Sequence, residues 1–429
     1  MTRILSAVVV VGLAAVAYFM PVPMAPEPGQ PSAVDPPAVA VCAVEEGSGR
    51  QTTVGVVSTV NDEGLFTAFA GGTSAGSTNF FTGGSGSTSI DVSKVAAVGI
   101  AAGLVELPSA DTATASVVQG AESLSAEGCA SMPERITVLA GGSTLSGRTF
   151  EVQLMNPYSG RAIVDLVIQS EVGLESSGEL EAVIVPPRSS IVVDLGDILP
   201  GRELLNVVIE TTRGSVLAVG RYGETGDSAV WRAVEPAQEW FVPVAHGLGA
   251  RSVLIANPSS VDVEYELDFY SADGVEEALL SEVIPAREVA VIDVGAITPA
   301  PAAVHIVSTG PIAAFVRMQE DGSTSLTSGA TVPASRWLLP GAGSIEGGFG
   351  SVVVFNPGIE EANFTLTARR GRSEAVNLTV EAGEILEVET FEARADGYVV
   401  DGDRPLVVMW TISDGIVSAA SIGTPLEDG

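Results

Sequence analysis

The sequence predicts an all-β protein, in which an N-terminal transmembrane or signal helix is followed by about four tandem, immunoglobulin-like antiparallel β-sandwich repeats. Three observations lead to this prediction: an uncharged apolar segment at the N-terminus, alternation of apolar and polar residues through the rest of the chain, and a motif that recurs close to every hundred residues. Alternation with period two, as in residues 263–269 and 363–367, is typical of strands that bury one face.

The N-terminal segment, residues 4–20, contains no charged residue, and a proline-rich stretch follows it. A helix of this length spans about 25 Å, between the core of a signal peptide and a full membrane span. We expect an uncleaved signal anchor at residues 1–20 and a linker at 21–41. Because Arg3 is the only basic residue before Arg50, the rest of the chain is expected outside the cell membrane. The alternative is a protein secreted after signal cleavage.

Cys42 and Cys129 are the only cysteines of the chain, and they bracket one domain-sized segment. In an oxidising compartment such a pair predicts a disulfide, which would stabilise this segment by ~4–5 kcal/mol in the chain-entropy model. The alternative is two separate buried thiols.

Asn-Pro pairs mark three copies of a repeat and stand 101 and 99 residues apart. Each pair ends an apolar strand, because asparagine can cap a turn while proline stops the hydrogen-bond ladder. We therefore interpret the asparagines as structural turn signals. The pairs are Asn156-Pro157, Asn257-Pro258 and Asn356-Pro357.

A second motif begins the later copies: Trp240 with Pro243, and Trp337 with Pro340, 97 residues further on. Residues 42–131 lack an Asn-Pro pair and are interpreted as a degenerate first sandwich that depends on the disulfide instead. The expected sandwiches are residues 42–131, 132–235, 236–333 and 334–429.

These motifs resemble an actinobacterial family of membrane-anchored or secreted proteins, a domain of unknown function with tandem Asn-Pro-bearing repeats. The resemblance covers residues 130–425 and extends loosely to the first sandwich. It implies a role in the cell envelope and carries over no catalytic residue.

The charge of the chain limits its partners. With 20 Lys and Arg against 53 Asp and Glu, the formal net charge is −33, which repels the phosphates of nucleic acids. The sequence therefore predicts no nucleic-acid partner.

Candidate chemical groups are few. Ser74 lies in a Gly-Xaa-Ser-Xaa-Gly string that lacks the strand and helix of a nucleophile elbow, and neither His246 nor His305 has neighbouring ligands in the sequence. We interpret all three as structural, and Trp231 and Trp410 as packing residues like the other tryptophans. Four acidic pairs could bind Ca²⁺ but are interpreted as solvated loops. The pairs are Glu45-Glu46, Glu276-Glu277, Glu360-Glu361 and Asp401 with Asp403.

The sequence thus predicts no catalytic residue, cofactor or metal site. It favours a non-catalytic cell-envelope protein, tethered to the membrane by its N-terminal helix, that acts as a scaffold or binds another envelope protein through free sheet edges. The alternative is a hydrolase of envelope polymers with a carboxylate pair at a domain interface.

Overall fold

The computed structural model describes residues 38–426 apart from short gaps. The gaps are residues 48, 97–98, 108, 110, 225, 247–248, 272–273, 321–322, 344, 346–347, 370–374 and 391–394. The predicted signal anchor and most of the linker lie outside the described residues. Strand β1 begins at Ala38, so the last four residues of the predicted linker belong to the first sandwich. Among the helices of the described part, none is long and apolar enough to cross a membrane.

The first sandwich has two antiparallel layers of four strands, β4-β3-β6-β1 and β5-β2-β7-β8. Both layers contribute apolar residues to one core that includes Cys42, Phe66 and Val105. Its elements are β1 (Ala38–Glu46), β2 (Gln51–Ser58), β3 (Glu63–Ala70), β4 (Thr73–Phe81), η1 (Gly83–Ser85), β5 (Ser87–Asp91), η2 (Val92–Lys94), β6 (Ile100–Leu107), β7 (Thr112–Gln119) and β8 (Leu124–Gly128).

The second sandwich repeats this order in the layers β12-β11-β15-β9 and β14-β10-β16-β17, with β13 also paired to β11. Its elements are β9 (Ile136–Gly142), β10 (Thr149–Asn156), β11 (Ala162–Ser170), β12 (Gly173–Glu175), β13 (Val183–Val185), β14 (Ser189–Asp194), α2 (Leu195–Ile198), β15 (Leu205–Arg213), β16 (Leu217–Glu224) and β17 (Asp227–Arg232).

In the third sandwich one long strand, β23, runs through both layers, so the orders become β21-β20-β23-β18 and β22-β19-β23-β24. Its elements are β18 (Ala237–Val244), β19 (Ala250–Ala256), β20 (Val263–Ser271), β21 (Gly274–Ile284), β22 (Val289–Asp293), α3 (Val294–Ile297), β23 (Ala302–Glu320) and β24 (Ser323–Ser328).

The fourth sandwich shares its long strand β30 in the same way, with the layers β28-β27-β30-β25 and β29-β26-β30-β31, and β32 paired to β25. Its elements are β25 (Ala334–Pro340), β26 (Phe349–Phe355), β27 (Ala362–Arg369), β28 (Val376–Val380), β29 (Ile385–Thr390), β30 (Gly397–Ser413), β31 (Ser418–Ile422) and β32 (Thr424–Leu426). The protein is therefore all-β in the described part, as predicted. Its strand order differs from the ABED and CFG sheets of an immunoglobulin constant domain.

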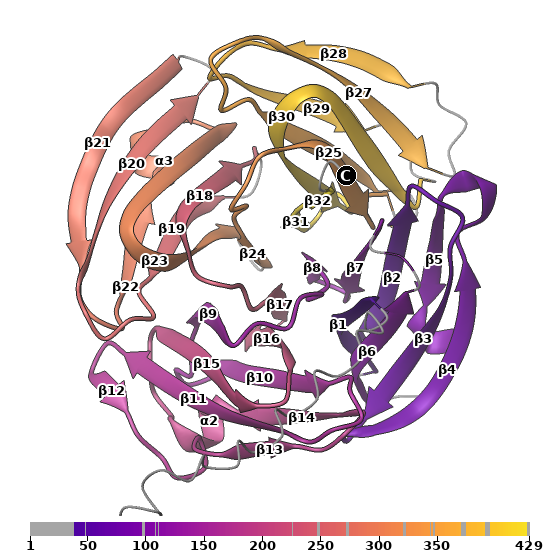
Figure 1. Ribbon diagram of the computed structural model, residues 1–429, viewed down its shortest axis with the longest axis vertical. Helices are drawn as coiled ribbons and strands as arrows, with labels where there is room; N and C mark the ends of the chain where they lie inside the picture. The colour runs from indigo at the N-terminus through magenta and orange to yellow at the C-terminus, as the bar shows by residue number, and fades with distance from the viewer. Residues whose placement is uncertain are drawn as a thin grey trace, which may run out of the picture. The chain divides into compact units, whose positions relative to one another are not determined.

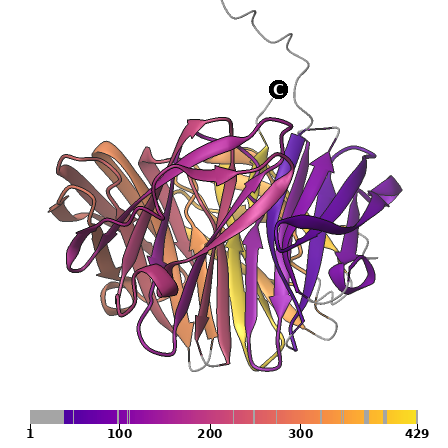
Figure 2. The same cartoon turned by 90° about the horizontal axis from the view of Figure 1, so that it is seen from below.

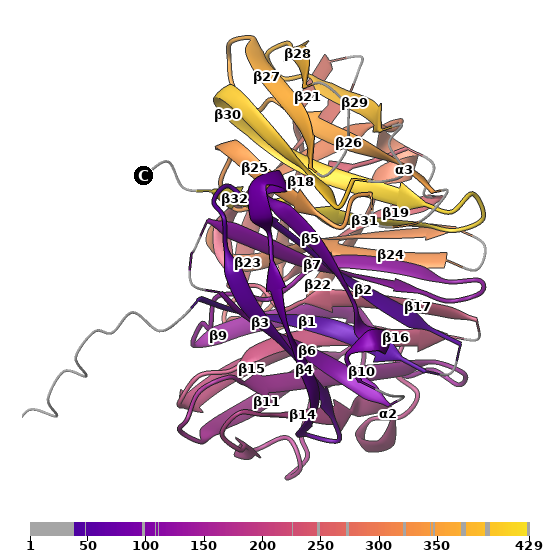
Figure 3. The ribbon, with the colours of Figure 1, turned by 90° about the vertical axis from the view of Figure 1, so that its right-hand side faces the viewer.

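The four sandwiches, which form one compact part from Ala38 on, surround a common axis (Figure 1). At the centre, β8, β17, β24 and β31 contact one another in cyclic order; we call these four the inner strands. Figure 3 shows the first sandwich between the second and the fourth, and Figure 2 shows the strands running between the two faces of the ring. The first and last sandwiches thus meet and close the ring.

Each inner strand is the end strand of its layer, and hydroxyl groups of a neighbouring inner strand cover the free edges of β8, β17 and β31. An uncovered edge would leave backbone N–H groups without partners. Serine and threonine side chains accept these hydrogens across the sandwich boundaries. The bonds run from Val230 N to Ser125 Oγ (2.8 Å), from Ala420 N to Ser325 Oγ (3.0 Å), from Ile422 N to Thr327 Oγ1 (3.2 Å) and from Gly128 N to Ser421 Oγ (3.0 Å). A free edge for binding, as predicted for each sandwich, therefore has to lie away from these covered inner edges.

The asparagines of the Asn-Pro pairs are buried at equivalent strand ends and tie two turns together. Asn257 donates from Nδ2 to the carbonyls of Val261 (2.8 Å) and Ile284 (3.1 Å), and its Oδ1 accepts from Ser259 N (2.9 Å). Asn156 and Asn356 make the corresponding bonds. Pro157, Pro258 and Pro357 follow directly after these strand ends.

The first sandwich has a counterpart of this asparagine, which the sequence did not reveal. Ser58 ends β2 and is fully buried, and its hydroxyl accepts from the N–H two residues on, that of Val60, at 3.2 Å. The first sandwich is therefore a complete copy of the repeat in its strand order, with serine in place of asparagine.

Trp240 and Trp337 anchor the first strands of the third and fourth sandwiches. Both are fully buried, and their indole nitrogens donate to the carbonyls of Ile312 and Leu406 on the long strands, each at 2.9 Å. Pro243 and Pro340 lie further along the same strands, β18 and β25.

The predicted disulfide between Cys42 and Cys129 is confirmed, with Cα atoms 4.4 Å apart. It joins β1 to the segment that follows β8, beside a bridge between Val41 and Ala130. The other sandwiches repeat this bridge at Val138 and Val234, Phe241 and Ala330, and Leu338 and Thr424.

Candidate functional site

A cavity of about 460 Å³ lies between the second and third sandwiches and is the candidate functional site. One wall comes from β9, β16 and β17 and the loops beside them, and the other from β22, β23 and β24. The lining residues are Gly141, Ser143, Arg148, Glu171, Glu203, Leu204, Tyr222, Ala229, Trp231, Val291, Arg317, Gln319, Thr324 and Leu326.

Trp231 forms the floor of this pocket because two glycines make room for aromatic rings. A Cβ atom on Gly220 would lie 2.7 Å from the Trp231 indole, and one on Gly142 would lie 2.1 Å from the ring of Phe150. Phe150 stacks on Trp231 with centroids 5.3 Å apart. The buried Nε1 of Trp231 has no hydrogen-bond partner in the described structure, so a donor is left for a ligand.

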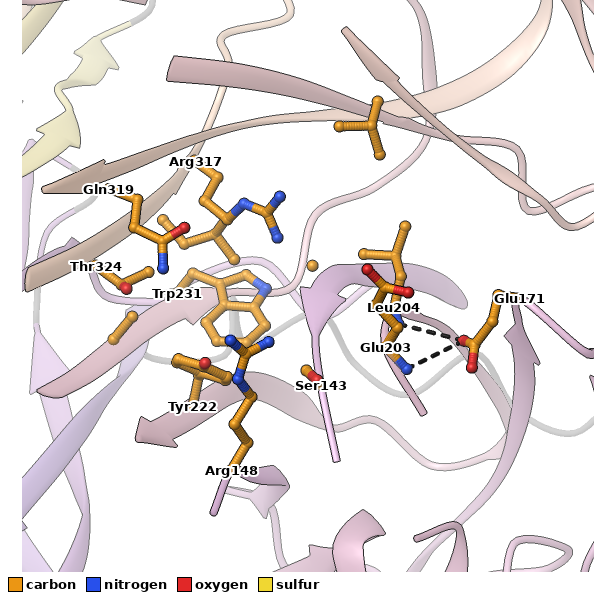
Figure 4. A pocket seen from close by; sticks show the side chains of 14 residues that line it. Ser143, Arg148, Glu171, Glu203, Leu204, Tyr222, Trp231, Arg317, Gln319 and Thr324 are labelled. Carbon is orange, nitrogen blue, oxygen red and sulfur yellow. Dashed lines mark hydrogen bonds between the residues drawn. The ribbon is translucent and has the colours of Figure 1, made fainter. Parts of the chain in front are cut away.

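Two arginines make one end of the pocket cationic. Figure 4 shows the guanidinium groups of Arg148 and Arg317 on opposite sides of the Trp231 indole. Arg148 contacts Glu224 at 3.3 Å, whereas Arg317 makes no hydrogen bond or ion pair with any residue that the structure describes. Burial lowers the pKa of Arg317 and Arg148 adds to this effect, while Tyr222 and Glu203 oppose it only in part. A bound anion would offset both the desolvation of the Arg317 guanidinium and its repulsion by Arg148.

The other end of the pocket carries Glu171 and Glu203 (Figure 4). Glu171 accepts hydrogen bonds from the backbone N–H groups of Glu203 (3.2 Å) and Leu204 (3.3 Å). Burial raises the pKa of Glu171, but these backbone donors outweigh it, so the pKa is lowered overall. Glu171 is therefore held as a carboxylate.

Tyr222 completes the wall beside Arg148. Its hydroxyl donates to Glu224 at 2.6 Å, and burial together with this bond raises the pKa of the phenol well above its usual range. Tyr222 is therefore a neutral donor committed to Glu224 and supplies no base at ordinary pH.

The sequence candidates do not gather at this pocket. Ser74 is exposed on the end strand β4, where it pairs with Phe69 in a strand and not at a turn before a helix. Trp231 is the one singled-out residue that lines the pocket, although we expected it only to pack, while Trp410 is buried in β30.

Each histidine contacts a carboxylate that the sequence did not place beside it. His246 is exposed, with Nδ1 2.8 Å from Glu387, whose other oxygen accepts from the Ser351 hydroxyl. The glutamate stands between the serine and the imidazole, so the hydroxyl does not contact a base as a nucleophilic triad requires.

His305 lies in β23 with its ring stacked on Phe241, centroids 4.6 Å apart, and Nε2 2.8 Å from Glu239. Over the part of the chain that is described, no cluster of three or more His, Cys, Asp or Glu residues could hold a metal ion.

The acidic pairs differ in how far they are buried. Glu45, predicted to be solvated, is buried and bridges Arg50 (2.6 Å) and Arg221 (2.9 Å), so that prediction is wrong for it. The others that the structure describes lie at the surface, where Glu360 pairs with Arg404, Asp401 with Arg336, and Asp403 with Asn363. The side chains of Glu276 and Glu277 lie outside the described residues.

Glu127, on the inner strand β8, is a buried acid that the sequence did not single out. Burial raises its pKa to about 7, although Arg232, Thr327 and Ser421 oppose the shift. It sits at the axis, where the other inner strands carry Trp231, Thr327 and Ser421, and does not line the pocket.

Comparison with known proteins identifies a family and little else. A family model described as a family of unknown function, DUF5719, matches residues 101–224 and 234–420. No curated protein matches the sequence. A solved structure of invasin, a bacterial integrin-binding protein, is 12% identical and covers 80% of this chain and 78% of its own, but with a TM-score of 0.10 it carries no argument.

Proposed function

Because the chain belongs to the family of unknown function DUF5719, membership brings no activity with it, and we propose from the chain's own architecture that it is a non-catalytic, extracytoplasmic envelope protein that binds another envelope protein. In this proposal residues 1–20 tether it to the membrane and the ring of sandwiches is the binding platform. The actinobacterial origin implied by the resemblance remains a prediction.

The disulfide supports the extracytoplasmic location. Disulfides persist in oxidising compartments and are rare in the cytoplasm. Cys42 and Cys129 are both buried, and their bond holds a joint that the other three sandwiches hold without cysteine.

The contrast between inner and outer sheet edges carries the binding proposal. The inner edges of β8, β17 and β31 are covered by the hydroxyl groups described above. The outer layers end in strands such as β21, the longest of them, with 11 residues. Val275 and Val283 of β21 are exposed. A partner strand can add to an edge of this kind by backbone hydrogen bonds.

The binding proposal is tested by photocrosslinking in the producing cells. A photoreactive residue at Val283 should capture a discrete protein, whereas the same residue at Ile416, which is 80% exposed in the β30–β31 hairpin, should not. Equal yields at both positions, or none at either, would remove the outer edge as the docking site.

The location is tested separately on intact cells. External protease should degrade the sandwiches, and the mature protein should retain residues 4–20. A mature chain that begins at Tyr18 or later would show a secreted protein, and protection from protease would overturn the extracytoplasmic assignment.

The alternative function, hydrolysis of envelope polymers by a carboxylate pair, has less support. Glu171 and Glu203 both line the pocket between two sandwiches. A general acid needs a raised pKa, however, and the pKa of Glu171 is lowered.

A further inference from the structure

Two arginines occupy the same position in the second and third sandwiches but have different surroundings. Arg221 on β16 lies opposite Glu151 in the ladder, and Arg317 on β23 lies opposite Ser252. Arg221 contacts Glu151 at 3.0 Å and Glu45 of the preceding sandwich at 2.9 Å. Its charge is fully matched by two carboxylates.

Arg317 has lost both of these partners. Ser252 replaces the glutamate on the neighbouring strand. In the preceding sandwich Gly142 stands four residues after the bridge residue Val138, as Glu45 stands four residues after Val41. The third sandwich therefore keeps the arginine but lacks the two carboxylates that pair with it in the second sandwich. The pocket occupies the space beside Arg317.

The pocket supplies further donors around this vacant anion position. The Trp231 Nε1 is buried and unpaired in the described structure, and Arg148 lies on the other side of the indole (Figure 4). Glu203 and Gln319 are exposed, so the pocket opens to solvent. We propose that this pocket binds a small ligand through a carboxylate group, which occupies the position that glutamate carboxylates hold beside Arg221.

The geometry favours a carboxylate over a spherical anion. A guanidinium fork matches the two oxygens of a carboxylate, and charge-assisted hydrogen bonds of this kind are about twice as strong as neutral ones. The volume of about 460 Å³ suits a ligand of small-molecule size. Because the side chains of Glu171 and Glu203 line the same pocket, a second negative group on the ligand is disfavoured.

The indole N–H of Trp231 provides a direct readout. The chain has four tryptophans, so a spectrum of the full chain labelled with ¹⁵N should contain four indole resonances, and Trp231→Phe assigns one of them. Acetate should shift this resonance in a saturable manner and leave the other three in place. Chloride at equal ionic strength should not shift it, and inorganic phosphate should bind more weakly than acetate.

Variants of one residue separate the site from general charge effects. Arg317→Gln should weaken acetate binding about tenfold or more, as expected for the loss of a charge-assisted hydrogen bond. Arg161→Gln makes the same change of charge at an exposed position outside the pocket and should have no effect. The three unaffected indole resonances report that each variant is folded.

Ser252→Glu gives the sharpest test because it restores the missing partner. The new carboxylate should pair with Arg317 as Glu151 pairs with Arg221, and so should abolish acetate binding while raising the melting temperature. An unmoved Trp231 resonance in acetate, tighter binding of phosphate or chloride, equal losses in Arg317→Gln and Arg161→Gln, or undiminished binding in Ser252→Glu would each overturn the proposal.

Discussion

In the first and third sandwiches, the first strand is joined to the segment that follows the inner strand, but by different contacts. We call this contact the joint. In the third, Val242 packs over Gly329, where an added Cβ atom would lie only 2.9 Å from the valine side chain. In the first, the corresponding residues are Cys42 and Cys129, which are bonded to each other. The third sandwich also has Trp240 beside this joint, whereas the first has the much smaller Ala40. A covalent link thus replaces apolar packing where the packing residues are small.

Removing the disulfide should cause the largest effect. Cys42→Ala combined with Cys129→Ala should lower the free energy of unfolding by ~4–5 kcal/mol, since the bond closes a loop of 87 residues. Urea denaturation measures the loss, and hydrogen exchange should locate it in β1–β8. Reductant should destabilise the unmodified protein similarly and leave the variant unchanged; coincident urea curves would show that packing alone holds the joint.

The second effect concerns Glu127, a buried acid on the inner strand of the first sandwich. Its pKa is raised from 4.5 in the unfolded chain to about 7, so the folded state binds the proton more tightly. Its contribution is therefore full below pH 4.5 and is lost as the pH rises through 7, a change of roughly 3 kcal/mol.

Glu127→Gln should remove this dependence and raise the melting temperature above pH 7 more than at pH 4.5. Glu361→Gln, at an exposed acid of the fourth sandwich, is the control for the loss of one charge. The assignment fails if both variants give parallel profiles of melting temperature against pH.

The third test compares the two capping residues. Asn257→Ala removes a buried side chain that makes five hydrogen bonds and should cost about 3 kcal/mol, whereas Ser58→Ala removes a hydroxyl that makes three and should cost about 2 kcal/mol. Urea denaturation of both variants gives the ratio. Equal losses in the free energy of unfolding would mean that Ser58 stabilises the first sandwich as strongly as Asn257 stabilises the third.

The smallest effect should come from moving the disulfide. Val242→Cys combined with Gly329→Cys should form a bond in the third sandwich and stabilise it by about 1–2 kcal/mol, because lost valine packing offsets part of the gain. Mass spectrometry without reductant detects the bond. Free thiols at these positions would show that the two joints are not equivalent.

The sequence predicted the strands from local alternation of apolar and polar residues, and it predicted the disulfide because Cys42 and Cys129 are the only cysteines of the chain. Asn156, Asn257 and Asn356 each cap their own turn, and this requires a particular side chain at a particular spacing. The ring could not be predicted, since the serines that cover the inner edges look like ordinary polar residues of a strand. Ser58 was missed for the same reason.

The pocket could not be predicted from sequence patterns because its walls come from two different sandwiches. Arg317 was visible as a charge at the end of an apolar strand, but its lack of a partner appears only when its ladder neighbour, Ser252, is compared with Glu151. Trp231 was noticed as a large apolar residue, yet its free N–H depends on the space that Gly220 provides.

The closure of the ring also constrains how the protein is made. The hydroxyl of Ser421 accepts from the N–H of Gly128, 293 positions earlier in the chain. During synthesis the first sandwich therefore emerges with one edge exposed, and this edge is covered only after β31 has been made. A truncated chain would keep that edge open to aggregation or to proteases. A fifth repeat would have no place in the closed circle, so the number of repeats is set by geometry and not by length alone.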